Sequence, residues 1–242
     1  MQEPWVHLIV QGKGGIGKSL TASWLAQYLQ AKGRKLRGID TDPINPTFAG
    51  YAGLPVVHVR FTDAAMNVDK RQFDAFMDIL IEHDGDMVVD NGASSFLAVM
   101  HYMIENNVVA ELESAGKKVM IHSPIIGGQG MKETLNALET ILECLPANVV
   151  VWENEWLGPI QSDGKVFTEF DSYIEHKDRI KGVVKIAQRS ADTFGYDINL
   201  MTTEKLTFEQ VKTSDKFRYM AKQRMNTVQR DIGAQLDEVL GL

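Results

Sequence analysis

The sequence predicts a doubly wound α/β fold, in which a mostly parallel β-sheet is flanked by helices. Short runs rich in valine and isoleucine alternate along the chain with longer segments of helical periodicity. This alternation is typical of βαβ units with right-handed crossovers. Several of the runs are apolar without interruption, as in strands that are buried on both faces. A glycine-rich turn joins the first run to the first helical segment, where such folds bind ligands.

Each apolar run and each periodic segment predicts one element. The predicted strands are Trp5–Val10, Lys35–Asp40, Val56–Phe61, Asp86–Asp90, Lys118–His122, Asn148–Trp152 and Gly182–Ile186. The predicted helices are Leu20–Ala31, Phe73–Ile81, Met131–Leu145 and an amphipathic C-terminal helix, Asp215–Leu240. Glu153–Phe170 lacks periodicity and is predicted as a long loop at the carboxyl edge of the sheet.

Composition narrows the class of protein. The chain has 242 residues, of which 44% are hydrophobic and 24% charged, as in globular proteins. No boundary stands out, so residues 1–242 are predicted to form a single domain. The single cysteine, Cys144, excludes an internal disulfide framework, a cysteine-rich zinc site and a complete iron–sulfur ligand set within one subunit.

The sequence shows neither a secretory signal nor an apolar run of about 18 residues that could span a membrane. The expected location is therefore the cytoplasm, with recruitment to the inner membrane or the nucleoid left open. The net charge of −7 argues against binding nucleic acid over the whole surface.

Residues 12–19 form a predicted phosphate-binding loop. Gly12-Lys13-Gly14-Gly15-Ile16-Gly17-Lys18-Ser19 fits the pattern G-x-x-x-x-G-K-[ST] between a strand and a helix. Its glycines let backbone N–H groups approach phosphate oxygens, and the following helix directs its positive N-terminus at the anion. Lys18 can reach the β- and γ-phosphates, and the Ser19 hydroxyl can bind Mg²⁺.

With Lys13, this loop resembles the deviant Walker A motif of the MinD/ParA-type ATPases. The resemblance implies a P-loop ATPase fold, ATP and Mg²⁺ as cofactors, and an ATP-dependent homodimer in which Lys13 reaches the partner's phosphates. It also implies catalytic roles for Lys13, Lys18 and Asp42. The implied ATP-binding residues are Gly12, Lys13, Gly14, Gly15, Ile16, Gly17, Lys18, Ser19, Leu20 and Asn154.

Two acidic segments resemble the switch segments of the same family. Asp40-Thr41-Asp42-Pro43 follows the second strand; the resemblance implies that Asp42 orients the attacking water and that Asp40 lies in the outer shell of the metal. Met87–Gly92 resembles the Walker B segment, so Asp90 would hold Mg²⁺ through water, together with Ser19. The family usually has Gln after the proline and lacks Asn after the later aspartate, so Ile44 and Asn91 are departures.

A third resemblance concerns the base of the nucleotide. In this family an asparagine after a late strand hydrogen-bonds to the adenine edge, which implies that role for Asn154. Trp156, two residues later, either shields a nucleotide base or anchors a partner.

Four strings resemble one branch of the family, the TraL-type conjugal transfer proteins encoded in plasmid transfer regions. They are Gln11–Gly15, Ile39–Asn45, Asp90–Phe96 and Trp156–Ile160. This resemblance implies an ATP-driven dimerisation switch with slow hydrolysis that serves conjugation or type IV secretion through a machinery protein.

Other functions stay open on the sequence. A DNA-segregation ATPase would bind DNA non-specifically through residues 212–230, using Lys212, Lys216, Arg218, Lys222 and Arg224, although a solvated helix face is the preferred interpretation of these charges. A docking protein with negligible turnover and a metabolic ligase or reductase would use the same motifs.

Overall fold

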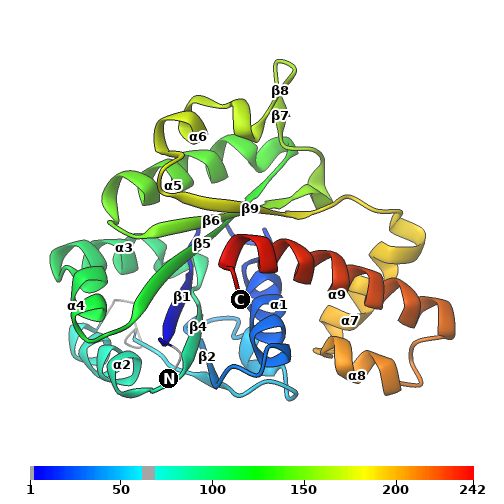
Figure 1. Ribbon diagram of the computed structural model, residues 1–242, viewed down its shortest axis with the longest axis horizontal. Helices are drawn as coiled ribbons and strands as arrows, with labels where there is room; N and C mark the ends of the chain where they lie inside the picture. The colour runs from blue at the N-terminus through cyan, green and yellow to red at the C-terminus, as the bar shows by residue number, and fades with distance from the viewer. Residues whose placement is uncertain (1–2, 62–68) are drawn as a thin grey trace.

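The computed structural model describes residues 3–61 and 69–242. Its centre is a seven-stranded sheet of order β3-β2-β4-β1-β5-β6-β9, in which all neighbouring strands are parallel (Figure 1). The strands are β1 (Trp5–Ile9), β2 (Leu36–Asp40), β3 (Val56–His58), β4 (Asp86–Asp90), β5 (Lys118–Ile126), β6 (Asn148–Asn154) and β9 (Ile180–Ile186). The predicted fold class is confirmed.

Helices cover both faces of the sheet (Figure 1). One face carries α1 (Lys18–Ala31), α7 (Tyr196–Thr203), α8 (Phe208–Thr213) and α9 (Tyr219–Leu240), and the other carries α2 (Lys70–Glu82), α3 (Phe96–Glu105), α4 (Val108–Ser114) and α5 (Met131–Cys144). Each layer has its own core, and successive residues of one strand enter different cores: Val149 and Val151 of β6 face one, Val150 the other. The strands are therefore apolar on both faces.

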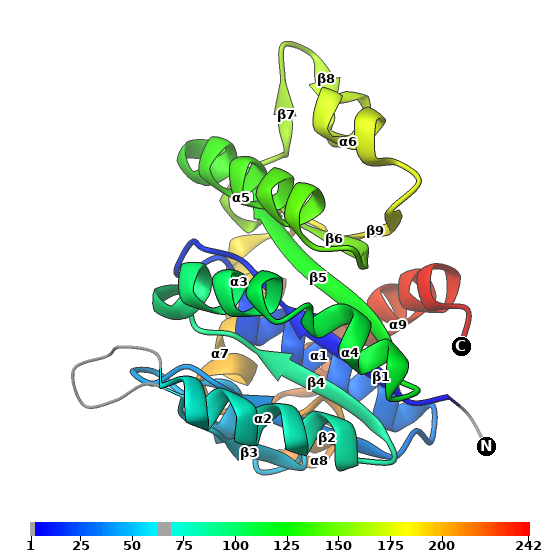
Figure 2. The ribbon, with the colours of Figure 1, turned by 90° about the vertical axis from the view of Figure 1, so that its left-hand side faces the viewer.

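The segment of residues 161–176 projects away from the sheet beyond α5 (Figure 2). It contains the antiparallel hairpin of β7 (Gln161–Ser162) and β8 (Lys165–Val166), followed by α6 (Asp171–His176). The prediction of a structureless loop over Glu153–Phe170 is therefore wrong in part, since β6 runs to Asn154 and the hairpin follows. Short helical turns complete the chain: η1 (Phe48–Gly50), η2 (Ala93–Ser95), η3 (Gly128–Gly130), η4 (Glu155–Leu157), η5 (Phe167–Glu169) and a π-helical turn, η6 (Ala191–Gly195).

The C-terminal helix begins later than predicted. Residues 215–218 form a turn, in which the Lys216 N–H donates to Ser214 Oγ and Arg218 is extended. The helix therefore starts at Tyr219, although Phe217 is still buried against the core as its apolar character predicts. Among the residues that the structure describes, no helix has the length and apolarity needed to cross a bilayer.

Candidate nucleotide-binding site

The loop between β1 and α1 has the backbone of an anion-binding turn. Gly15 and Gly17 have φ values of +73° and +96°, a left-handed conformation that strongly favours glycine. Helix α1 begins at Lys18 with no side-chain cap and no acidic residue in its first turn. Its first N–H groups therefore remain available for an anion such as phosphate.

Lys18 is a buried cation at this helix terminus. Its residue is only 8% exposed, and Nζ donates a hydrogen bond to the Lys13 carbonyl oxygen at 2.7 Å. Burial lowers the pKa of Lys18, while the carboxylates of Asp90 and Asp42 oppose the shift. A desolvated cation held at this position is suited to neutralising phosphate charge.

The sheet brings the two acidic segments together. Asp40 ends β2, Asp90 ends β4, and the two residues are partners in the parallel register. Asp40 itself is turned to the backbone: Oδ1 accepts the Asp42 N–H at 3.0 Å and Oδ2 accepts the Ala49 N–H at 2.9 Å. Asp40 thus shapes the loop that carries Asp42, and its predicted place in an outer metal shell stays a prediction.

Asp90 carries a buried carboxylate oxygen that is available to a ligand. Its residue is 2% exposed, and Oδ1 is buried without a hydrogen-bond partner among the described residues. Burial, aided by the Asp40 and Asp42 carboxylates, raises the pKa of Asp90 to about 7, against a hydrogen bond with Ser19 and the charge of Lys18. A lone carboxylate oxygen beside a serine hydroxyl fits a hard divalent cation such as Mg²⁺.

The described part of the chain contains no cluster of three or more His, Cys, Asp or Glu side chains that could hold a metal alone. Mg²⁺ commonly keeps several waters and binds through one or two carboxylates plus substrate phosphates. Ser19 and Asp90 would therefore suffice as the protein's contribution to a metal held mainly by water and nucleotide.

Asp42, in the first acidic segment, lies against the second. Its Oδ1 accepts the N–H groups of Ile44 and Asn45, at 2.9 and 3.0 Å, which fixes the side chain. Gly92 packs directly against it, because a Cβ built on Gly92 would lie 3.1 Å from Asp42 Oδ2. Asn91 joins the same edge, since its amide bonds to the Ile9 carbonyl and its Oδ1 accepts from the Thr41 hydroxyl.

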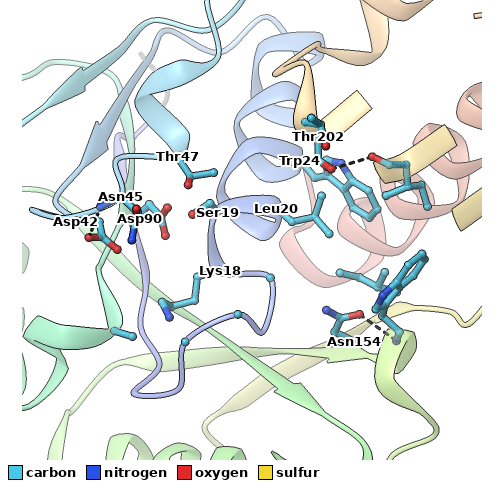
Figure 3. A pocket seen from close by; sticks show the side chains of 18 of the residues that line it. Lys18, Ser19, Leu20, Trp24, Asp42, Asn45, Thr47, Asp90, Asn154 and Thr202 are labelled. Atoms are coloured by element: carbon cyan, nitrogen blue, oxygen red, sulfur yellow. Dashed lines mark hydrogen bonds between the residues drawn. The ribbon is translucent and has the colours of Figure 1, made fainter. Parts of the chain in front are cut away.

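The phosphate loop and the ends of the two acidic segments border one open cavity of about 670 Å³, shown in Figure 3. Lys18, Ser19, Asp42 and Asp90 line one part of it, and Leu20, Asn154 and Trp156 line another. Of the remaining predicted ATP-binding residues, Gly14, Gly15 and Gly17 line the cavity. The others, Gly12, Lys13 and Ile16, do not line it.

Lys13 points to α5 in this single subunit. Its Nζ lies 2.5 Å from Glu133 Oε2 in a partly exposed ion pair. Its side chain crosses Gly130, where an added Cβ would lie 2.9 Å from Lys13 Cε. The predicted contact of Lys13 with a partner's phosphates stays a prediction.

Comparisons with known proteins agree with this geometry. The CobQ/CobB/MinD/ParA nucleotide binding domain matches residues 7–193. The chain belongs to this family. It is 36% identical to an Escherichia coli protein named Protein TraL over 96% of this chain and 97% of that protein. Among solved structures it resembles the MinD cell division protein of Aquifex aeolicus (TM-score 0.53, 16% identity, 98% of both chains) and Pyrococcus horikoshii MinD complexed with Mg-ADP (TM-score 0.53, 14% identity, 98% of both chains).

Within this MinD/ParA-family fold, sequence reasoning missed the residue that holds the phosphate loop in place. Gln11 is 1% exposed; its Oε1 accepts the Gly12 N–H at 2.8 Å, and its Nε2 donates to the carbonyls of Pro124 and Thr134 at 3.2 and 3.0 Å. Thr134 in turn lies in the first turn of α5. No local pattern predicts this role for Gln11, because the two carbonyls that it binds, of Pro124 and Thr134, are more than a hundred residues away.

Further cavity residues were also missed. Trp24 on α1 is 2% exposed, and its Nε1 is buried without a hydrogen-bond partner in the described part of the chain. Arg189 follows β9, and Thr202 and Lys205 lie at the end of α7 and just beyond it. Only the folded chain brings these positions next to the phosphate loop.

The basic segment is divided and partly neutralised. Lys212 lies in α8 and pairs with Glu209, and Lys216, in the turn, pairs with Glu204. Arg224, in α9, pairs with Asp197 at 2.6 Å. Three of the five cations named for DNA are therefore paired within the chain, which favours the solvated-face interpretation over a DNA patch.

Proposed function

We propose that this chain is an ATP-binding and slowly ATP-hydrolysing dimerisation switch that works in plasmid conjugation. The observation that carries the proposal is the unpartnered Asp90 carboxylate oxygen beside Ser19 and the buried Lys18, at an uncapped helix N-terminus. The family and the Mg-ADP complex of a structural relative support the nucleotide. Similarity to Protein TraL over nearly the whole chain supports the biological setting.

Each residue has a defined task in this proposal. Lys18 and the first N–H groups of α1 bind the phosphates, and Ser19 and Asp90 hold Mg²⁺, which neutralises phosphate charge when bound. Asp42, fixed by two backbone N–H groups, positions the attacking water. Because Gly92 lies against Asp42, loss of the γ-phosphate would shift both loops together and change the surface that they form.

The decisive test measures solution mass by light scattering. Asp42→Ala should bind Mg²⁺-ATP without turning it over, so its mass should double with ATP and not with ADP. Lys18→Ala should bind no nucleotide and stay monomeric, whereas Lys165→Ala, at an exposed position on the β7–β8 hairpin, should behave as the unaltered chain.

Two outcomes would contradict the proposal. If Asp42→Ala binds ATP but stays monomeric, the dimer and the role of Lys13 across it fail, and a single-subunit ATPase or docking protein replaces them. If a plasmid carrying Lys18→Ala still transfers at the normal frequency although the protein no longer binds ATP, the link between nucleotide and conjugation fails.

A further inference from the structure

Asn154 is held from both sides by the protein itself. It ends β6 and is 7% exposed. Its Nδ2 donates to the Ile16 carbonyl of the phosphate loop at 3.0 Å, and its Oδ1 accepts the Trp156 N–H at 3.2 Å. The loop approaches so closely that a Cβ on Gly17 would lie 2.9 Å from Nδ2. Asn154 therefore connects the phosphate loop to the turn that carries Trp156.

Trp156 has the position of a platform at one end of the cavity. Its residue is 44% exposed and lines the cavity. One edge of its indole is fixed, because a Cβ on Gly195 would lie 2.7 Å from Cη2. The turn is also tied to the end of β9: Glu155 Oε1 lies 3.0 Å from Lys185 Nζ, and Oε2 accepts the Gln188 N–H at 3.4 Å.

The walls near this platform suit a flat heteroaromatic ring. Leu20 and Ile186 contribute apolar surface to the same cavity. Arg189 also borders the cavity but is held elsewhere, because its guanidinium pairs with Asp231 and lies 4.8 Å from the Phe194 ring centroid. A partly exposed indole in a cavity that aliphatic side chains also line is an environment in which a base gains from stacking.

We propose that the nucleotide base stacks on Trp156, and that Asn154 is a positioning residue joining this platform to the phosphate loop rather than a hydrogen-bonding partner of the base edge. The inference rests on the proposed nucleotide-binding function and assigns how this chain recognises the base. It replaces the base-edge contact that family resemblance implies for Asn154. A positioning role and a base-edge contact predict different effects of an Asn154 substitution on the binding of a ligand that has no base.

Calorimetric titration with three probes, Mg²⁺-ATP, Mg²⁺-GTP and magnesium tripolyphosphate, tests the proposal. Trp156→Ala should weaken both nucleotides by about tenfold or more and leave tripolyphosphate unchanged, because only the stacking surface is lost. Trp156→Phe should restore most of the affinity. Leu157→Ala, at an exposed neighbouring residue outside the cavity lining, is the matched control and should match the unaltered chain.

Asn154→Ala should weaken all three probes together and keep the ATP-to-GTP ratio, because it releases the phosphate loop. Asn154→Asp keeps the acceptor for the Trp156 N–H and loses the donor to the Ile16 carbonyl. It should therefore also weaken all three probes and keep the ATP-to-GTP ratio, and it provides the test if the alanine variant folds poorly.

The proposal is overturned if Trp156→Ala binds ATP normally. It is also overturned if an Asn154 variant changes the ATP-to-GTP ratio and leaves tripolyphosphate unaffected, the result expected of a base-edge contact. If the unaltered chain binds ATP and Trp156→Ala binds it equally well, only this inference fails. If the unaltered chain binds neither nucleotide, the proposed function fails as well, whether or not tripolyphosphate binds.

Discussion

Folding and cation binding favour opposite protonation states of the Asp90 carboxyl group. Burial raises its pKa from 3.8 to about 7, so the folded chain keeps this proton at pH values where the unfolded chain has lost it. Stability therefore falls as pH rises from 3.8 to about 7, and the loss persists above that range. A bound cation would instead favour the ionised form of this carboxyl group.

Asp90→Asn should consequently raise stability and lower function. Without nucleotide at pH 8, its free energy of unfolding in urea should rise by up to about 4 kcal/mol, since the buried charge is removed. The Mg²⁺ dependence of nucleotide affinity should weaken by about 10- to 100-fold in calorimetric titrations. Asp163→Asn, at an exposed turn of the β7–β8 hairpin, should change neither quantity. Unchanged Mg²⁺ dependence in Asp90→Asn would remove Asp90 from the metal site.

Local chemistry decides which site residues a sequence can reveal. Lys18, Ser19 and Asp90 were predicted because each lies within a few residues of a strand end or helix start, where the chain itself fixes their place. The structure adds that Asp40 is turned to backbone N–H groups, which depends on the path of the loop up to Ala49. Trp24 and Gln11 escape local patterns because their environments come from distant segments.

At the scale of elements, Gln11 links the phosphate loop to β5 and α5. One buried side chain contacts the Gly12 N–H, the Pro124 carbonyl in β5 and the Thr134 carbonyl in α5. Glu133, next to Thr134, holds Lys13. Movement of the start of α5 would therefore reach both the loop backbone and Lys13.

Gln11→Ala should test this link. It leaves the Gly12 N–H without its acceptor, which costs about 1–3 kcal/mol, and removes one donor from each of the Pro124 and Thr134 carbonyls. We expect lower thermal stability and a nucleotide affinity reduced by about tenfold, which corresponds to roughly 1.4 kcal/mol. Gln30→Ala, at an exposed position on α1, provides the control. Stability loss with normal affinity would show that Gln11 supports the core and not the loop.

The strands were largely predictable, whereas helices α4, α6, α7 and α8 were not among the predicted elements, and the errors in the bounds have physical causes. All seven predicted strands lie in the sheet, because runs apolar on both faces belong to a central parallel sheet. Strand β6 continues past Trp152 through Glu153 and Asn154, whose backbones pair with neighbouring strands although their side chains give no apolar signal. Strand β5 continues past His122 through Ser123 and Pro124, and a proline argues against a strand in a sequence pattern. The turn before α9 was missed because Phe217 fits the apolar stripe without being helical.

At the scale of the whole molecule, a series of buried, hydrogen-bonded side chains crosses the middle of the sheet. The Trp152 indole N–H of β6 donates to His122 Nδ1 of β5 at 3.0 Å, and His122 Nε2 lies 3.0 Å from His7 Nδ1 of β1. Because His122 Nδ1 accepts, a neutral His122 carries its proton on Nε2 and donates it to His7. His7 then carries its proton on Nε2, which has no partner in the described part of the chain. Both imidazoles are therefore held neutral.

The two buried histidines make the stability of the fold sensitive to acid pH. Burial lowers the pKa of His7 from 6.5 to about 4, with Asp86 opposing the shift and Arg34 adding to it, and burial lowers the pKa of His122 well below its usual value. Below pH 6.5 these two histidines become protonated in the unfolded chain but stay neutral in the folded chain. The free energy of unfolding therefore decreases as pH falls toward 4. Asp40, Asp90 and Glu153 have raised pKa values and oppose this trend. A comparison between variants is therefore needed to isolate the histidines.

His7→Asn, which keeps a polar group near His122 without an imidazole to protonate, isolates the contribution of His7. Between pH 7 and pH 4 the unaltered chain should lose about 3 kcal/mol more free energy of unfolding than this variant, because only the unaltered chain must keep His7 neutral. Denaturant unfolding across this range measures the difference, and the raised carboxylate pKa values affect both proteins alike. His101→Asn, at an exposed position on α3, is the matched control. Parallel stability curves for His7→Asn and the unaltered chain would mean that water or a local opening admits the proton at the sheet centre. The three strands that place the phosphate loop and Asn154 would then be less tightly closed than the burial of His7 and His122 indicates.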